Sequence, residues 1–263
     1  MNSILFHGIL LAYLFATLGF WGYFGIRQPW LFRLANGLVG VGLALHTTLL
    51  AQHVGAESWR AWSDVSTAMA LLAWAISVGY LITWWRTRIE ALGSFMMPLA
   101  FLAASVSTVP TATASPLASA LQHVLLATHI VLAVLGYAAL ALTFCAGVMY
   151  LIQERQLKSH APGVWSRRLP SLSVLDDLNA RALTLGLPLL TQGLVTGSVW
   201  AKAARGSYFN WRMTSVPLVL ALVLYVLLWT GRYTLGWRGR MAAAAAVTGF
   251  LLVLASYFVH TAS

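Results

Sequence analysis

Charged residues are scarce in this chain of 263 residues: 8% are Asp, Glu, Lys or Arg, whereas 60% are hydrophobic. The surface of a soluble domain of this size needs far more charge, so the composition excludes an ordinary soluble protein. Cysteine is almost absent too, since Cys145 is the only one and lies inside an apolar run. One cysteine excludes an internal disulfide, a Cys-x-x-Cys thiol relay and a Cys-x-x-Cys-His haem attachment site.

Long apolar runs are what the sequence has in place of charge. Several approach or exceed the roughly 20 residues that cross a bilayer as a helix. They predict an all-α, polytopic integral membrane protein with eight transmembrane helices and one domain over 1–263. The expected spans are 4–25, 34–54, 65–85, 92–109, 122–152, 180–203, 213–231 and 241–260.

The basic residues predict the orientation of these spans. The chain has 16 Lys and Arg against 6 acids, and in a membrane protein such cations mark cytoplasmic loops rather than a nucleic-acid partner. The second, fourth and sixth loops hold four of them, and the remaining twelve lie in or beside the other loops. Both termini are therefore expected on the outer (periplasmic) side of a bacterial inner (plasma) membrane, with the lipid bilayer as the first partner.

Two polar connections stand out in this topology. The inner loop 153–180 is the longest, and Ser173 with Asp176 three residues later predicts a helix cap at its end. The outer loop 200–212 carries aromatic residues and three cations without an acid. Its tryptophans fit an aromatic belt at the lipid headgroups as well as a platform for a flat, hydrophobic ligand.

Single histidines are the most informative polar residues inside the apolar runs. His46 lies deep in the second expected span, and His53 follows on nearly the same helix face, about 10 Å further along. His129 lies near the outer end of the fifth span, after a loop that has no charged residue. Such imidazoles serve as haem ligands, proton relays or hydrogen-bonding partners.

The acidic residues give no pattern of an enzyme site. Asp176 and Asp177 are adjacent and therefore face different ways, so no enzymatic activity is expected.

Four stretches resemble the cytochrome c assembly family of membrane proteins, the CcsA and HemX-like group. The first stretch comprises 129–137 and 150–158, and the second comprises 169–178, Arg181 and 185–191. The third comprises 197–201 and 206–208, and the fourth comprises 236–239 and the last span. The resemblance implies that an outward aromatic loop flanked by histidines handles haem, which the family delivers to apocytochrome c. It implies His129 as the outer haem ligand and His46 as the intramembrane ligand, with His53 nearby. Positions of the haem-handling loop are matched by Trp200, Gly206, Tyr208 and Trp211.

Four positions depart from the family pattern: Arg205, Phe209, Arg212 and Thr230. They replace tryptophans, an acid and an intramembrane histidine, which makes the chain most similar to the shorter HemX-like members. The sequence thus predicts a haem-binding or haem-passing accessory protein of cytochrome c assembly or tetrapyrrole metabolism. Two alternatives stay open: a scaffold that binds no haem and acts on a partner complex through the inner loop 153–180, and a cytochrome b-like electron carrier.

Overall fold

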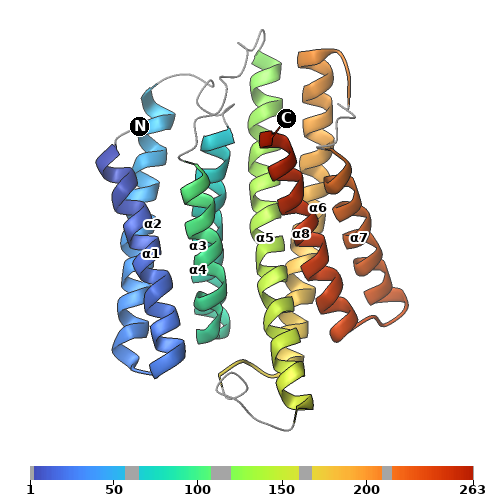
Figure 1. The fold of residues 1–263 in the computed structure, drawn as a ribbon. Helices are drawn as coiled ribbons and strands as arrows, with labels where there is room; N and C mark the ends of the chain where they lie inside the picture. Colours follow the sequence, from blue (N-terminus) through green and yellow to red (C-terminus); the bar gives the residue numbers. More distant parts are fainter. Residues whose placement is uncertain (1–2, 57–64, 108–119, 160–167, 209–214, 263) are drawn as a thin grey trace. The chain divides into compact units, whose positions relative to one another are not determined.

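The regular elements in the part of the chain that the structure describes are all helical, which confirms the predicted all-α class (Figure 1). The computed structural model describes residues 3–56, 65–107, 120–159, 168–208 and 215–262. Within these ranges the elements are α1 (Ser3–Ile26), α2 (Pro29–Ala56), α3 (Val65–Thr87), the 3-10 helix η2 (Glu90–Leu92), α4 (Gly93–Val106), α5 (Ala120–Lys158), α6 (Leu172–Arg205), α7 (Ser215–Thr234) and α8 (Arg240–Ala262).

Six of these helices are long and apolar enough to cross a membrane, judged by length and composition. They are α1, α2, α3, α5, α6 and α7. The apolar parts of the other two, Glu90–Val106 and Arg240–Ser256, are shorter. The 14 residues of α4 rise about 21 Å, which is less than the bilayer core of roughly 30 Å.

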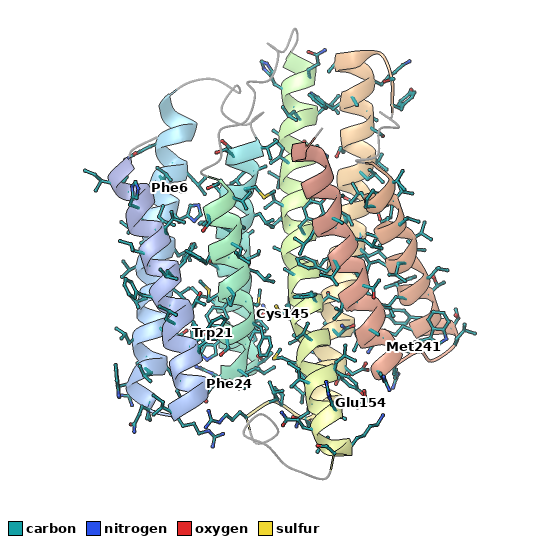
Figure 2. The ribbon with its side chains drawn as sticks, in the orientation of Figure 1. Phe6, Trp21, Phe24, Cys145, Glu154 and Met241 are labelled. Atoms are coloured by element: carbon teal, nitrogen blue, oxygen red, sulfur yellow. The ribbon has the colours of Figure 1, made fainter. Side chains whose placement is uncertain are left out.

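The chain forms two compact units, Met1–His123 and Val124–Ser263. In the first unit, α1 packs against both α2 and α4, and α3 packs against α4. The fully buried Phe20 ring lies 5.4 Å from the Tyr80 ring, between centroids. Trp21 on α1, labelled in Figure 2, donates its indole N–H to the Ser94 carbonyl oxygen of α4 at 2.9 Å. A single domain over 1–263 remains a prediction.

Glycines bring the helices of the second unit into close contact. A Cβ at Gly136 of α5 would lie 2.8 Å from the Leu190 backbone nitrogen of α6, and one at Gly147 would lie 2.9 Å from the Ala243 carbonyl oxygen of α8. Membrane helices gain little from apolar burial against each other, since lipid is equally apolar, and small residues that allow close packing stabilise them instead. The second unit is therefore built around α5 by steric fit.

The start of α6 differs from the prediction. The helix begins at Leu172, inside the expected inner loop 153–180, and its N-cap is Ser171. No side chain makes the capping hydrogen bond, so the predicted cap from Ser173 and Asp176 is wrong. The Asp176 carboxylate is occupied elsewhere: it forms an ion pair with Arg232 of α7 and accepts the Gly239 N–H at 3.0 Å. This carboxylate ties α6 to the connection between α7 and α8.

Candidate functional site

His46 lies in the buried interior of the first unit, as expected for an intramembrane histidine. Its side chain is 1% exposed, and its Nδ1 lies 3.2 Å from the hydroxyl oxygen of Tyr13 on α1. Its Nε2 has no hydrogen-bond partner among the residues that the structure describes. A buried polar atom is nearly always satisfied, so an open imidazole nitrogen marks this residue as a candidate ligand.

His129 projects from α5 toward α6 in the second unit. Its Nδ1 lies 2.7 Å from the Gly193 carbonyl oxygen. A carbonyl oxygen only accepts hydrogen bonds, so we assign the proton of the neutral ring to Nδ1 and the lone pair to Nε2. Histidines that bind metals commonly donate their second ring nitrogen to a backbone carbonyl, which fixes the ring orientation and makes the ligand more basic.

Gly197, one helical turn after Gly193, makes room for this imidazole. A Cβ at residue 197 would lie 2.5 Å from His129 Nδ1 and 2.6 Å from its Cε1, closer than any side chain permits. The ring thus fits because residue 197 has no side chain, and it is oriented by the backbone carbonyl of Gly193, four residues earlier on the same face of α6. We expect Gly197→Ala to displace the ring, break its bond to Gly193 and weaken haem binding by about 10- to 100-fold, the usual effect of losing a supporting contact.

The measurement is a hemin titration of the purified variant, followed by absorbance. Ser198→Ala is the matched control, because the Ser198 hydroxyl bonds only within its own helix, to the Val195 carbonyl oxygen at 2.8 Å. Equal affinities of the two variants would show that Gly197 does not support a ligand.

The aromatic end of α6 follows on the same helix. Trp200 is half-buried and lies three residues after Gly197, hence near the same face. The helix ends at Gly206, whose φ of 80° is a left-handed conformation that glycine adopts without strain. Lys202 Nζ donates to the Gly206 carbonyl oxygen at 2.8 Å and lies 5.3 Å from the centroid of the exposed Tyr208 ring.

Several predicted site residues lie outside the described part of the chain. Trp211, Phe209 and Arg212 are among them, and for His53 and Arg205 only the helical backbone is described. Thr230 is exposed on α7 and its hydroxyl donates to the Val226 carbonyl oxygen of its own helix. The structure therefore brings His129 together with Gly193 and Gly197, while His46 belongs to the other unit.

Sequence reasoning missed the residues that contact the two histidines. Gly193 and Gly197 have the small-xxx-small spacing of close membrane-helix packing, a signal that was available in the sequence. Tyr13 had no such signal, since a tyrosine in an apolar run is typical of any packed helix.

Comparison of the amino-acid sequence with known proteins identifies the family of this chain. The family model described as cytochrome C assembly protein matches residues 62–262. A cytochrome c biogenesis protein CcsA of Synechococcus sp. (strain CC9605) is 28% identical, over 98% of this chain and 92% of its own length. CcsA of Microcystis aeruginosa is 26% identical over 85% of this chain and 84% of its own length. CcsA of the alga Chlamydomonas reinhardtii is 31% identical over 74% of this chain and 56% of its own length.

Proposed function

Because this chain belongs to the cytochrome C assembly protein family, we propose that it is a membrane protein that binds or passes haem during cytochrome c assembly or in tetrapyrrole metabolism. Relatives named for cytochrome c biogenesis along nearly the whole chain support the first of these two settings. The proposed role is binding and not catalysis by side chains. Haem is the cargo, and apocytochrome c or other assembly proteins are the proposed recipients.

The single observation that carries the proposal is the hydrogen bond of 2.7 Å between His129 Nδ1 and the Gly193 carbonyl oxygen. This bond holds the half-buried imidazole in place through Nδ1 and leaves the Nε2 lone pair out of the bond. A histidine that binds haem iron as an axial ligand does so through such a lone pair. His129 in the second unit and His46 in the first would each serve as a haem ligand. Trp200 and Tyr208 would supply flat apolar surface beside it, with Gly206 shaping the end of α6 and Trp211 and His53 completing the proposed set.

The direct test is an absorption spectrum of the purified protein before and after hemin is added. Bound haem supplies a Soret band, and axial imidazole shifts its position relative to free hemin. We expect that shifted band at one haem per protein or fewer. If the Soret band keeps the position that it has in free hemin, the result contradicts haem binding and favours the scaffold that acts through the inner loop 153–180.

A surface feature makes that scaffold the second candidate. Leu151, Glu154, Arg155, Lys158 and Arg240 line a pocket of about 460 Å³ at the end of α5 and the start of α8. Glu154 pairs with Lys158 at 2.7 Å and with Arg240 at 3.9 Å. With Arg155, the pocket has three cations against this one acid, an excess of positive charge that would attract an acidic partner. Crosslinking from Lys158 should then capture the same partner with equal yield from the protein and from a His46→Ala, His129→Ala double variant.

We also propose the eight-span topology with both termini outside, in a bacterial inner membrane. It places the exposed residue Ser159 inside and the exposed residue Ser207 outside. In a Cys145→Ala background, a maleimide that cannot cross membranes should label Ser207→Cys in intact cells and Ser159→Cys only after lysis. The reverse pattern would invert the topology, and equal labelling of both in intact cells would contradict it.

A further inference from the structure

Two turns at one end of the first unit are built alike (Figure 1). The connection between α1 and α2 has two residues, the first of which is Arg27. The connection between α3 and η2 also has two, and its first residue is Arg88. Each arginine donates its backbone N–H to the carbonyl oxygen four residues earlier, to Tyr23 at 2.9 Å and to Trp84 at 2.8 Å. Each thus closes the last turn of the helix before it.

Both arginines have a backbone conformation that favours glycine. The φ angle is 60° at Arg27 and 56° at Arg88, and no other non-glycine residue in the described part of the chain has a positive φ. A side chain in this left-handed conformation costs free energy that glycine avoids. The connections after α6 and α7 do use glycine, at Gly206 and Gly236. Arginine at both turns of the first unit is therefore unfavourable to the fold, which indicates a role for the two guanidinium groups outside it.

A cluster of aromatic side chains connects the two turns. The Arg88 Cζ lies 5.2 Å from the centroid of the Trp84 ring, which lies 5.7 Å from that of Phe32 on α2. The Phe32 ring in turn lies 5.1 Å from that of Tyr23 on α1, whose hydroxyl donates to the Glu90 carboxylate of η2. Because Glu90 is two residues after Arg88, these contacts form a closed circuit. It fixes the two turns relative to each other.

This end of the first unit has an excess of positive charge. Residues 26–34 and 84–92, all of them described, hold one acid, Glu90, and four arginines, each of them exposed. The arginines are Arg27, Arg33, Arg86 and Arg88. One carboxylate neutralises one guanidinium at most, so four against one leaves a net charge of +3. A guanidinium that lies over an aromatic ring still has the N–H groups in its own plane for a second partner.

Exposed tryptophans accompany these arginines. Trp30 in the first turn of α2 is 59% exposed, and Trp85 in the last turn of α3 is 66% exposed. Tryptophan at the end of a membrane-crossing helix is typical of the lipid headgroup region. Arginine binds phosphate oxygens through paired N–H groups, and basic clusters at this depth attract anionic lipids. The combination complements an anionic phospholipid, which carries a phosphate and acyl chains in one molecule.

We propose that this set of arginines and tryptophans, the turn surface, binds the headgroups of anionic phospholipids. The turn surface consists of Arg27, Arg33, Arg86, Arg88, Trp30 and Trp85. Arg27 and Arg88 bind the phosphate, and the aromatic cluster holds the two turns in place for it. The proposal is independent of haem. Its assignment to the inner leaflet alone rests on the proposed topology, and the experiment below, in detergent, does not depend on that orientation.

The test is native mass spectrometry of the purified protein in detergent, titrated with dioleoyl phosphatidylglycerol or with dioleoyl phosphatidylcholine. The second lipid has the same phosphate and acyl chains but no net charge. We expect tighter binding of phosphatidylglycerol. Arg27→Gly and Arg88→Gly should each weaken it about fivefold, the effect of one basic residue near an anionic membrane surface. Equal affinity of the wild type for the two lipids, or unchanged phosphatidylglycerol affinity in the double variant, would overturn the proposal.

Two controls separate lipid binding from folding and from net charge. Because glycine adopts the left-handed conformation without strain, the glycine variants should keep or raise Tm in lipid-free detergent. Where one of them fails to fold, Arg33→Gln and Arg86→Gln replace it, since these residues lie in the helices α2 and α3. Arg238→Gly removes the same charge from an exposed arginine between α7 and α8 and should leave the affinity unchanged. An equal loss in Arg238→Gly would mean that net charge alone attracts the lipid, against the turn surface.

An acidic protein segment is the competing occupant of the turn surface. Poly-glutamate, titrated in place of the lipid, represents it. We expect poly-glutamate to bind more weakly than phosphatidylglycerol, because it has no acyl chains to lie beside the exposed tryptophans. Tighter binding of poly-glutamate that is lost in the double glycine variant would assign the surface to a protein partner and overturn the lipid.

Discussion

Replacing His129 by alanine is expected to weaken haem binding at least about tenfold, the smallest loss typical of groups that merely support a metal ligand. The variant removes the imidazole whose Nδ1 is bonded to the Gly193 carbonyl oxygen at 2.7 Å. It also removes one of the two side-chain partners of that carbonyl, the other being the Thr196 hydroxyl at 3.0 Å, and opens space against Gly197. The measurement is a hemin titration followed at the Soret band, with the reduced spectrum reporting the change of axial ligand.

His123→Ala is the matched control for this variant. His123 lies on the same helix, six residues earlier and also half-buried, so it faces a direction about 120° away. Its loss should leave the affinity within about twofold. If the His123 and His129 variants bind hemin equally well, His129 is not the ligand, and the inner-loop scaffold becomes the better hypothesis.

Asp176→Ala is expected to lower the free energy of unfolding by about 3 kcal/mol, the effect of removing one partner of a buried ion pair. Arg232 is 8% exposed and donates to both the Asp176 carboxylate and the Asp176 backbone oxygen, the latter at 2.9 Å. Without the carboxylate, the guanidinium charge stays buried with only the backbone oxygen as an acceptor from Asp176. The Gly239 N–H also loses its acceptor. Thermal unfolding in detergent should show a lower Tm for this variant.

Asp177→Ala provides an internal comparison, since Asp177 is the next residue and is exposed. It changes the net charge by the same amount and should leave Tm nearly unchanged. An equal drop in both variants would mean that charge at the start of α6, rather than the bond to Arg232, sets the stability. The Asp176→Ala, Arg232→Ala double variant should recover part of the loss, because no buried charge is then left unpaired.

The all-helical fold could be predicted from the sequence because of one constraint. A chain with 8% charged residues enters the bilayer, where every backbone N–H and C=O must be satisfied within its own segment, so each long apolar run becomes a helix. The helix ends were harder to predict. α2 begins at Pro29 rather than near 34, and α6 begins at Leu172 rather than near 180. Polar residues beside an apolar span can belong either to the helix or to the loop, so the apolar run alone does not fix the helix end.

The amino-acid sequence by itself thus determined the helical class, the family resemblance and the two histidines as candidate ligands. Tertiary structure decided what those histidines contact: Tyr13 is 33 residues from His46, and Gly193 is 64 residues from His129. It also turned Asp176 from a predicted cap into the partner of Arg232 and of Gly239, 63 residues away. The physical reason is that helices that are apolar all round carry no stripe to show which face meets which neighbour. In such helices the partners are chosen by steric fit at glycines and by single hydrogen bonds, and both exist only once the helices are packed.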